Sequence, residues 1–170
     1  MDRFLAIIDA VSEFTGRAVS YLVVPLILTI VYSVISRYFF NSIVHWSFEM
    51  TIFMFGIMVM LGGAYTLKQG AHVRVDVLPG YLGHRGKCLL DILSFVMVLG
   101  VCCVIIWLGT RSAWMSTLRL EHSSLQTPFN PQIWWFRWVI PLSALLIGLQ
   151  ALAEIIRTAR SFNQTPEERS

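Results

Sequence analysis

The sequence predicts an all-α integral membrane protein in which residues 1–170 form one membrane domain with four transmembrane helices. Only 14% of the residues are charged and 56% are hydrophobic, a balance that is rare in soluble domains of this length. The charged residues are also separated by four uncharged runs of 16 to 19 residues, namely 18–36, 50–67, 92–110 and 138–153. A helix rises about 1.5 Å per residue, so runs of this length match a hydrocarbon core that is ~30 Å thick.

A short amphipathic helix is expected to precede the first span, over residues 2–16, and to lie on the inner membrane surface. Phe4, Ile8 and Val11 fall on one face of such a helix, with Leu5 beside them. A helix with one apolar and one polar face settles in the plane of the membrane interface. The predicted fold therefore has an interfacial helix in addition to its four spans.

The spans extend a little beyond the uncharged runs, because interfacial side chains can flank them. The expected bounds are about 18–38, 47–67, 89–110 and 134–156. The last span gains length from the tryptophans at its start, while Arg137 and Glu154 reach the interfaces with their side chains. Arg157 is spaced to pair with Glu154 along the helix. Residues 157–170 are expected to form a polar cytoplasmic tail.

Both termini are predicted to lie in the cytoplasm, because Lys and Arg are unevenly divided between the two sides. The side that holds the termini carries nine: Arg3, Arg17, Lys68, Arg74, Arg85, Lys87, Arg157, Arg160 and Arg169. The opposite side carries four: Arg37, Arg111, Arg119 and Arg137. All six tryptophans fall towards that opposite side: Trp46, Trp107, Trp114, Trp134, Trp135 and Trp138. Interfacial tryptophans usually anchor a protein in lipid, and the one-sided distribution also suits a surface that packs on another protein.

The sequence does not indicate an enzyme or a cofactor-binding protein. It has no nucleotide-binding loop, serine-hydrolase motif or metal-ligand spacing. The histidines fall in expected loops or at span ends, whereas a membrane cytochrome needs imidazoles at haem depth. No span has a carboxylate in its middle, as proton-coupled pumps require. We expect a chain that binds the lipid bilayer and partner proteins, holds no cofactor or metal, does not bind nucleic acid and does not transport by itself.

Two polar clusters flank the second span and are the candidates for subunit contacts or structural roles. The outer cluster consists of Arg37, Asn41, Trp46 and Glu49, and the inner cluster consists of His72, Arg74 and Asp76. Arg37 and Glu49 flank the outer turn, and we expect them to form an ion pair directly or through Asn41. The inner cluster is expected to order the connection to the third span or to touch a partner.

The same clusters resemble those of a known family. The pattern Arg37-Tyr38-x-x-Asn41, Trp46-x-x-Glu49, an apolar span and His72-x-Arg74-x-Asp76 is similar to the small membrane subunit of tripartite ATP-independent periplasmic (TRAP) transporters, the DctQ-type or Q subunit. The four-span plan, the stretch from Ser124 to Pro128 and Pro141 early in the last span are also similar. The resemblance covers about Val19 to Arg157.

The resemblance implies a non-catalytic subunit of a secondary, sodium-coupled transporter in the bacterial inner membrane. In such a system a large membrane subunit binds sodium and an organic anion, and a periplasmic binding protein delivers the anion. The small subunit would brace the stationary part of the large one. Two alternatives remain open: a membrane-anchor subunit of a redox enzyme complex, and a self-contained small transporter or channel.

Overall fold

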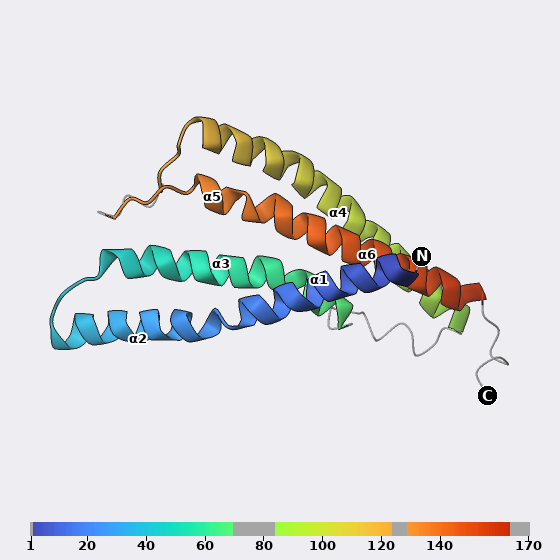
Figure 1. The fold of residues 1–170 in the computed structure, drawn as a ribbon, viewed down its shortest axis with the longest axis horizontal. Helices are drawn as coiled ribbons and strands as arrows, with labels where there is room; N and C mark the ends of the chain where they lie inside the picture. The colour runs from blue at the N-terminus through green and yellow to red at the C-terminus, as the bar shows by residue number, and fades with distance from the viewer. Residues whose placement is uncertain (1, 70–83, 124–128, 164–170) are drawn as a thin grey trace.

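The computed structural model describes residues 2–69, 84–123 and 129–163 (Figure 1). In these residues the chain is largely helical, and β-pairing is limited to an isolated bridge between His122 and Gln132. The helices, in chain order, are α1 (Asp2–Ser20), α2 (Val23–Phe39), α3 (His45–Lys68), α4 (His84–Leu118), α5 (Trp134–Arg137) and α6 (Val139–Asn163).

Four segments of the described chain are long and apolar enough to cross a bilayer, which confirms the predicted fold class. They are Leu5–Phe39, His45–Lys68, Leu89–Leu118 and Trp134–Ala159. The first segment combines α1 and α2 and has 35 residues. A helix of that length would measure roughly 52 Å, well above the ~30 Å hydrocarbon core, so we infer that part of this segment lies outside the core.

The chain turns between α1 and α2 at Tyr21 and Leu22. The backbone N–H of Leu22 donates to the carbonyl of Val19 at 3.0 Å. Pro25 stands in the first turn of α2, where its missing N–H costs no helical hydrogen bond. This break comes later in the chain than the boundary expected between residues 16 and 18.

Two helix pairs make up the bundle. α2 pairs with α3, while α4 packs along α5 and α6. α3 also packs on α6, which joins the two pairs. In Figure 1 the pairs diverge towards the end where α2 meets α3. We call the end that contains residues 40–44 the outer end, and the opposite end the inner end, in keeping with the predicted topology.

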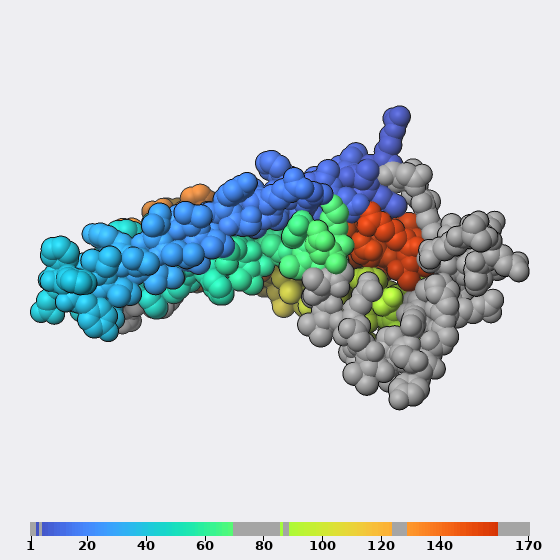
Figure 2. Space-filling model, turned by 90° about the horizontal axis from the view of Figure 1, so that it is seen from below, coloured from blue at the N-terminus to red at the C-terminus, as the bar shows by residue number. Residues whose placement is uncertain are grey.

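α1 packs on α3 and α6 by one face. Leu5 and Ile8 are buried there and form a core cluster with Ala153 of α6. Figure 2 shows α1 and α2 (blue) running over α3 (cyan to green) along the length of the molecule. Val11 of the predicted apolar face is exposed, and the face that packs on α6 includes the buried Ser12. Ser12 lies four residues after Ile8, so it follows Ile8 on the face that meets α6.

Small residues occupy the places where helices come closest. Ala64 of α3 and Ala151 of α6 are both fully buried. A Cβ atom on Gly16 of α1 would lie only 2.5 Å from Cβ of Tyr65 in α3. Membrane helices depend on such close packing, because lipid tails give apolar helix surfaces no hydrophobic reason to associate.

The last span begins with the short helix α5, which is separated from α6 by a turn at Trp138. α6 then continues to Asn163. Residues 157–163, expected as the start of a polar tail, therefore extend the last helix at the inner end.

Candidate subunit-binding site

The outer end of the α2–α3 pair contains one complete cluster of predicted site residues: Arg37, Asn41, Trp46 and Glu49. Asn41 follows α2 in the left-handed backbone region, with φ 48°. Asn enters that region at lower cost than most residues, because its short polar side chain can bond locally. The backbone N–H groups of Phe40 and Ser42 both donate to the carbonyl of Ser36 at 3.2 Å. Asn41 is therefore suited by its backbone to end α2 and reverse the chain.

Side-chain contacts hold the first turns of α3 against α2. The hydroxyl groups of Ser33 and Ser47 are hydrogen-bonded at 3.0 Å. The ring of Trp46 stacks on that of Tyr32, with centroids 6.0 Å apart and an interplanar angle of 28°. Trp46 thus takes part in the packing of the hairpin, although its side chain is still exposed.

A groove of about 490 Å³ runs between α2 and α3 in the outer half of the molecule. Its lining combines apolar side chains, hydroxyl groups and two basic side chains: Ile30, Ser33, Val34, Arg37, Tyr38, Ile43, Val44, His45, Ser47, Phe48 and Thr51. None of these lining residues is acidic. The hydroxyl of Thr51 donates to the carbonyl of Ser47 at 2.7 Å, so part of the polar lining is satisfied within the chain.

A direct ion pair between Arg37 and Glu49 is not among those formed by the described residues, whereas the expected contact through Asn41 stays a prediction. Arg37 is exposed and lines the groove. Glu49 is 0% exposed. It shares a helical face with Phe53, whose ring lies 5.0 Å from that of Phe136 between centroids. The two charged side chains therefore leave the hairpin in different directions, because Ser47, two residues before Glu49, already faces α2.

The inner cluster of His72, Arg74 and Asp76 lies outside the described residues. Its expected roles in ordering the connection to the third span, or in touching a partner, stay predictions.

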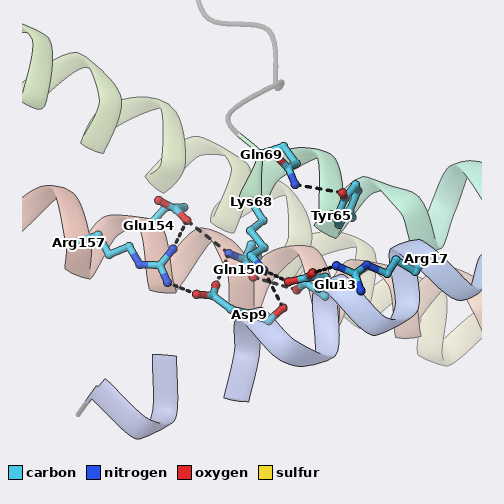
Figure 3. Close-up of polar contacts among 10 residues, drawn as sticks. Asp9, Glu13, Arg17, Tyr65, Lys68, Gln69, Gln150, Glu154 and Arg157 are labelled. Carbon is cyan, nitrogen blue, oxygen red and sulfur yellow. Dashed lines mark hydrogen bonds and ion pairs between the residues drawn. The ribbon is translucent and has the colours of Figure 1, made fainter. Parts of the chain in front are cut away.

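A polar network that sequence patterns did not reveal joins α1 to α6 at the inner end (Figure 3). Its centre is Gln150 of α6, which is fully buried. Gln150 Oε1 accepts a hydrogen bond from Ser12 Oγ at 2.8 Å, and its Nε2 donates to Asp9 Oδ1 at 3.1 Å and to Glu154 Oε1 at 3.3 Å. Arg157 donates to Glu154 Oε1 at 2.8 Å and also pairs with Asp9 Oδ2. One guanidinium group thus bridges a carboxylate of α1 and a carboxylate of α6.

A second branch of the network connects α1 to the end of α3. Lys68 Nζ donates to Glu13 Oε2 at 2.7 Å and to the backbone carbonyl of Asp9 at 3.2 Å. Arg17 pairs with the other oxygen of Glu13, but its side chain is 72% exposed. Such an exposed pair contributes little to stability, because water screens it. The contacts of Lys68 are the ones that fix α1 against α3, because they connect two helices.

Two signals could have pointed to this network from the sequence. Asp9, Glu13 and Arg17 recur at a spacing of four, which places them along one side of α1. Gln150 interrupts the apolar last run with an amide, which a lipid-facing position would not favour. Neither signal names its partner, because the partners lie on other helices.

Contacts at the outer end fix α5 and α6 against α4. Arg137 Nη2 pairs with Glu121 Oε1 at 2.7 Å, and Trp138 Nε1 donates to Thr117 Oγ1 at 3.0 Å. The part of the chain that the structure describes has no group of three or more His, Cys, Asp or Glu side chains suited to a metal ion. The arrangement is thus one of helix-to-helix contacts at both ends and an open groove on one side.

The sequence matches the family described as "Tripartite ATP-independent periplasmic transporters, DctQ component" over residues 26–161. A curated relative is the C4-dicarboxylate TRAP transporter small permease protein DctQ of Vibrio cholerae serotype O1. It is 29% identical over an alignment of 163 residues, which covers 85% of this chain and 67% of the relative. The family match covers well over half of the chain and includes all seven predicted site residues. The chain therefore belongs to the DctQ family, the small, non-enzymatic membrane components of TRAP transporters.

Proposed function

We propose that this chain is the small permease subunit of a sodium-coupled transporter that imports an organic anion. Its partners would be a large membrane subunit and a periplasmic binding protein. The observation that carries the proposal is the family match over residues 26–161 together with four apolar helices of membrane length. The small subunit would act as a scaffold that braces the stationary part of the large subunit.

The proposed substrate class is that of C4-dicarboxylates. The support is the name of the Vibrio cholerae relative, which is 29% identical to this chain. Dicarboxylates are doubly charged at neutral pH, so their import against an inside-negative potential needs a coupling ion.

The positions of the ionisable groups support a division of labour between the two membrane subunits. In the described spans the carboxylates stand near helix ends, with Glu49 in the first turns of α3 and Glu154 in the inner part of α6. Substrate and sodium sites of secondary transporters lie near the bilayer midplane and are built from polar groups there. We therefore place the sodium ion and the anion on the large subunit.

Reconstitution tests the proposal. Proteoliposomes would contain the large subunit with or without this chain, and uptake of a radiolabelled C4-dicarboxylate would be followed with the binding protein outside. We expect uptake only with all three proteins and an inward sodium gradient. Full sodium-driven uptake without this chain would overturn the scaffold role, and uptake without a gradient would overturn the coupling.

We also propose that the protein lies in the bacterial inner membrane with both termini in the cytoplasm. The charge asymmetry between the two sides and the one-sided tryptophans support this orientation. Single cysteines at Asn130 and Gln69, both exposed, would be treated with a membrane-impermeant maleimide in spheroplasts, after replacement of the native cysteines. Labelling of position 130 but not of position 69 is expected, and the reverse pattern would overturn the orientation.

The redox-anchor alternative receives no support from the family match. His45 and His122 lie at the outer end of the bundle, and His84 begins α4 at the inner end. A haem between membrane helices needs imidazole ligands inside the bundle.

A further inference from the structure

α2 belongs to the span that the chain itself covers least. In the apolar window of the segment that contains α2, 6% of the residues are buried, compared with 39% in the last span. α2 makes its main contacts with α3, whereas α3 and α4 both pack on α6. In lipid there is no hydrophobic driving force that would hold α2 in place with so few contacts.

The groove between α2 and α3 has features of a surface that binds another membrane helix, which we call the helix seat. Small hydroxyl side chains, Ser33, Ser47 and Thr51, line its floor together with apolar residues. Small and hydroxylated residues are the ones that let membrane helices approach each other closely. The groove also carries Arg37 and His45 and no acidic residue, and Arg37 makes no ion pair within the described chain. An acceptor from outside the chain would complement this charge.

The groove continues along an open face of α3. Phe48 lines the groove, and Phe55, Val59 and Gly62 follow it on the same side of the helix. The three larger side chains are more than half exposed. A Cβ atom built on Gly62 would meet nothing within 4 Å, so there is room for another backbone at that point. The face from Phe48 to Gly62 is about 21 Å long, most of the ~30 Å that a membrane-spanning helix crosses.

We propose that the α2–α3 groove and the open face of α3 together receive one transmembrane helix of the large membrane subunit, with a carboxylate of that subunit on Arg37. This inference rests on the proposed function. A protein helix is favoured over a lipid acyl chain as the occupant, because the groove carries Arg37 and His45 without an acidic residue, and a helix can bring a carboxylate whereas an acyl chain cannot.

A pair of glycine substitutions tests the seat. Gly62 of α3 and Gly100 of α4 both face space with no atom within 4 Å of a built Cβ, so a large side chain fits at either position in the isolated chain. Gly62→Trp is expected to lower recovery of the large subunit with this chain about tenfold, because the indole would occupy the helix seat. Gly100→Trp should leave recovery within about twofold of the unsubstituted chain. Equal recovery for the two variants would overturn the proposal.

Photochemical cross-linking supplies a second measurement that does not depend on lost binding. Phe55 on the open face and Val101 on α4 are both exposed, and each would be replaced by photoreactive p-benzoylphenylalanine. Position 55 is expected to give a covalent adduct of both chains, and position 101 is expected to give none. Adducts from position 55 to lipid alone, or adducts of both chains from position 101 alone, would overturn the proposal.

The design separates failure of this inference from failure of the proposed function. If the unsubstituted chain does not recover the large subunit at all, the proposed function itself is wrong. If it does, and Gly62→Trp binds as well as Gly100→Trp, the assembly is right and the helix seat is wrong. Comparison of the melting temperatures of the two isolated variants confirms that each remains folded. An Arg37→Ala variant that binds at full strength would remove the proposed carboxylate contact.

Discussion

The hydroxyl of Ser12 in α1 donates a hydrogen bond of 2.8 Å to Oε1 of Gln150 in α6, across 138 positions of sequence. The two side chains are 1% and 0% exposed. A buried polar group that loses its partner is costly, because no water replaces the missing hydrogen bond. The N-terminal helix is therefore fastened to the last span at a point that solvent does not reach.

Replacement of the central amide should loosen this attachment. Gln150→Leu removes hydrogen bonds to Ser12, Asp9 and Glu154 and leaves Ser12 buried without its acceptor. We expect a loss of about 1–3 kcal/mol in the free energy of unfolding, measured by thermal unfolding of the purified chain in detergent. Ser20→Ala is the control, because Ser20 donates to a carbonyl of its own helix in an exposed position, and it should change stability by less than about 0.5 kcal/mol. Equal melting temperatures for the two variants would contradict the role of Gln150.

The two partners in the Asp9–Arg157 pair should differ in importance. Arg157→Ala removes the cation between Asp9 and Glu154, whereas Asp9→Ala leaves Arg157 with Glu154 at 2.8 Å. We expect losses of roughly 2 and 1 kcal/mol respectively, since removing a shared cation leaves two carboxylates without it. Chemical denaturation in detergent would measure both, with the exposed Arg17→Ala as a control near zero. If Asp9→Ala lost as much unfolding free energy as Arg157→Ala, or more, Arg157 would not be the cation that both carboxylates depend on.

The close approach of α1 and α3 makes Gly16 sensitive to the addition of a methyl group. In Gly16→Ala the new Cβ would lie 2.5 Å from both Cβ and Cγ of Tyr65, and no side-chain rotation moves Cβ away, because the backbone fixes its position. The helices must separate, and we expect a loss of about 1–3 kcal/mol. Gly100→Ala, where no atom lies within 4 Å, should be neutral or slightly stabilising because Ala favours helix. Thermal unfolding of the two variants measures the difference. An unchanged melting temperature for Gly16→Ala would show that α1 and α3 are not tightly packed at Gly16 and Tyr65.

The end of α4 offers a substitution that should stabilise the protein. Leu120 has φ 46°, and the N–H of Glu121 donates to the carbonyl of Ser116 at 3.1 Å, an arrangement in which glycine is preferred. Leu120 is also exposed, so little packing is lost in Leu120→Gly. We expect a gain of about 0.5–1 kcal/mol in unfolding free energy. Leu118→Gly, at the exposed last residue of α4, should lower the unfolding free energy. A lower melting temperature for Leu120→Gly would contradict the prediction.

The four spans could be predicted because they depend on local composition. A run such as 92–110 must cross lipid wherever its neighbours lie, so its helix is determined by its own residues. The pairing of Arg157 with Glu154 was predictable for the same reason, since both stand on one helix three residues apart.

The contacts between helices could not be predicted in this way. The direct ion pair expected between Arg37 and Glu49 does not form among the described residues, because closeness in sequence around the hairpin turn does not determine the direction of each side chain. The docking of α1 on α6 through Ser12 was not predicted, because only the contact with Gln150 shows which face of α1 meets the last span. Both outcomes depend on which helix faces which, and local sequence patterns do not show it.

The docking of α1 also has a consequence for biosynthesis. A ribosome delivers Asp9 and Glu13 before Lys68, and Gln150 and Arg157 follow only with the last span. Lys68 can pair with Glu13 once α3 is in place, but the contacts of Asp9 with Gln150 and Arg157 form only after the last span is inserted, as a late step. A nascent chain that stops before Gln150 would lack the contacts between α1 and α6. The network thus distinguishes a finished polypeptide from an unfinished one.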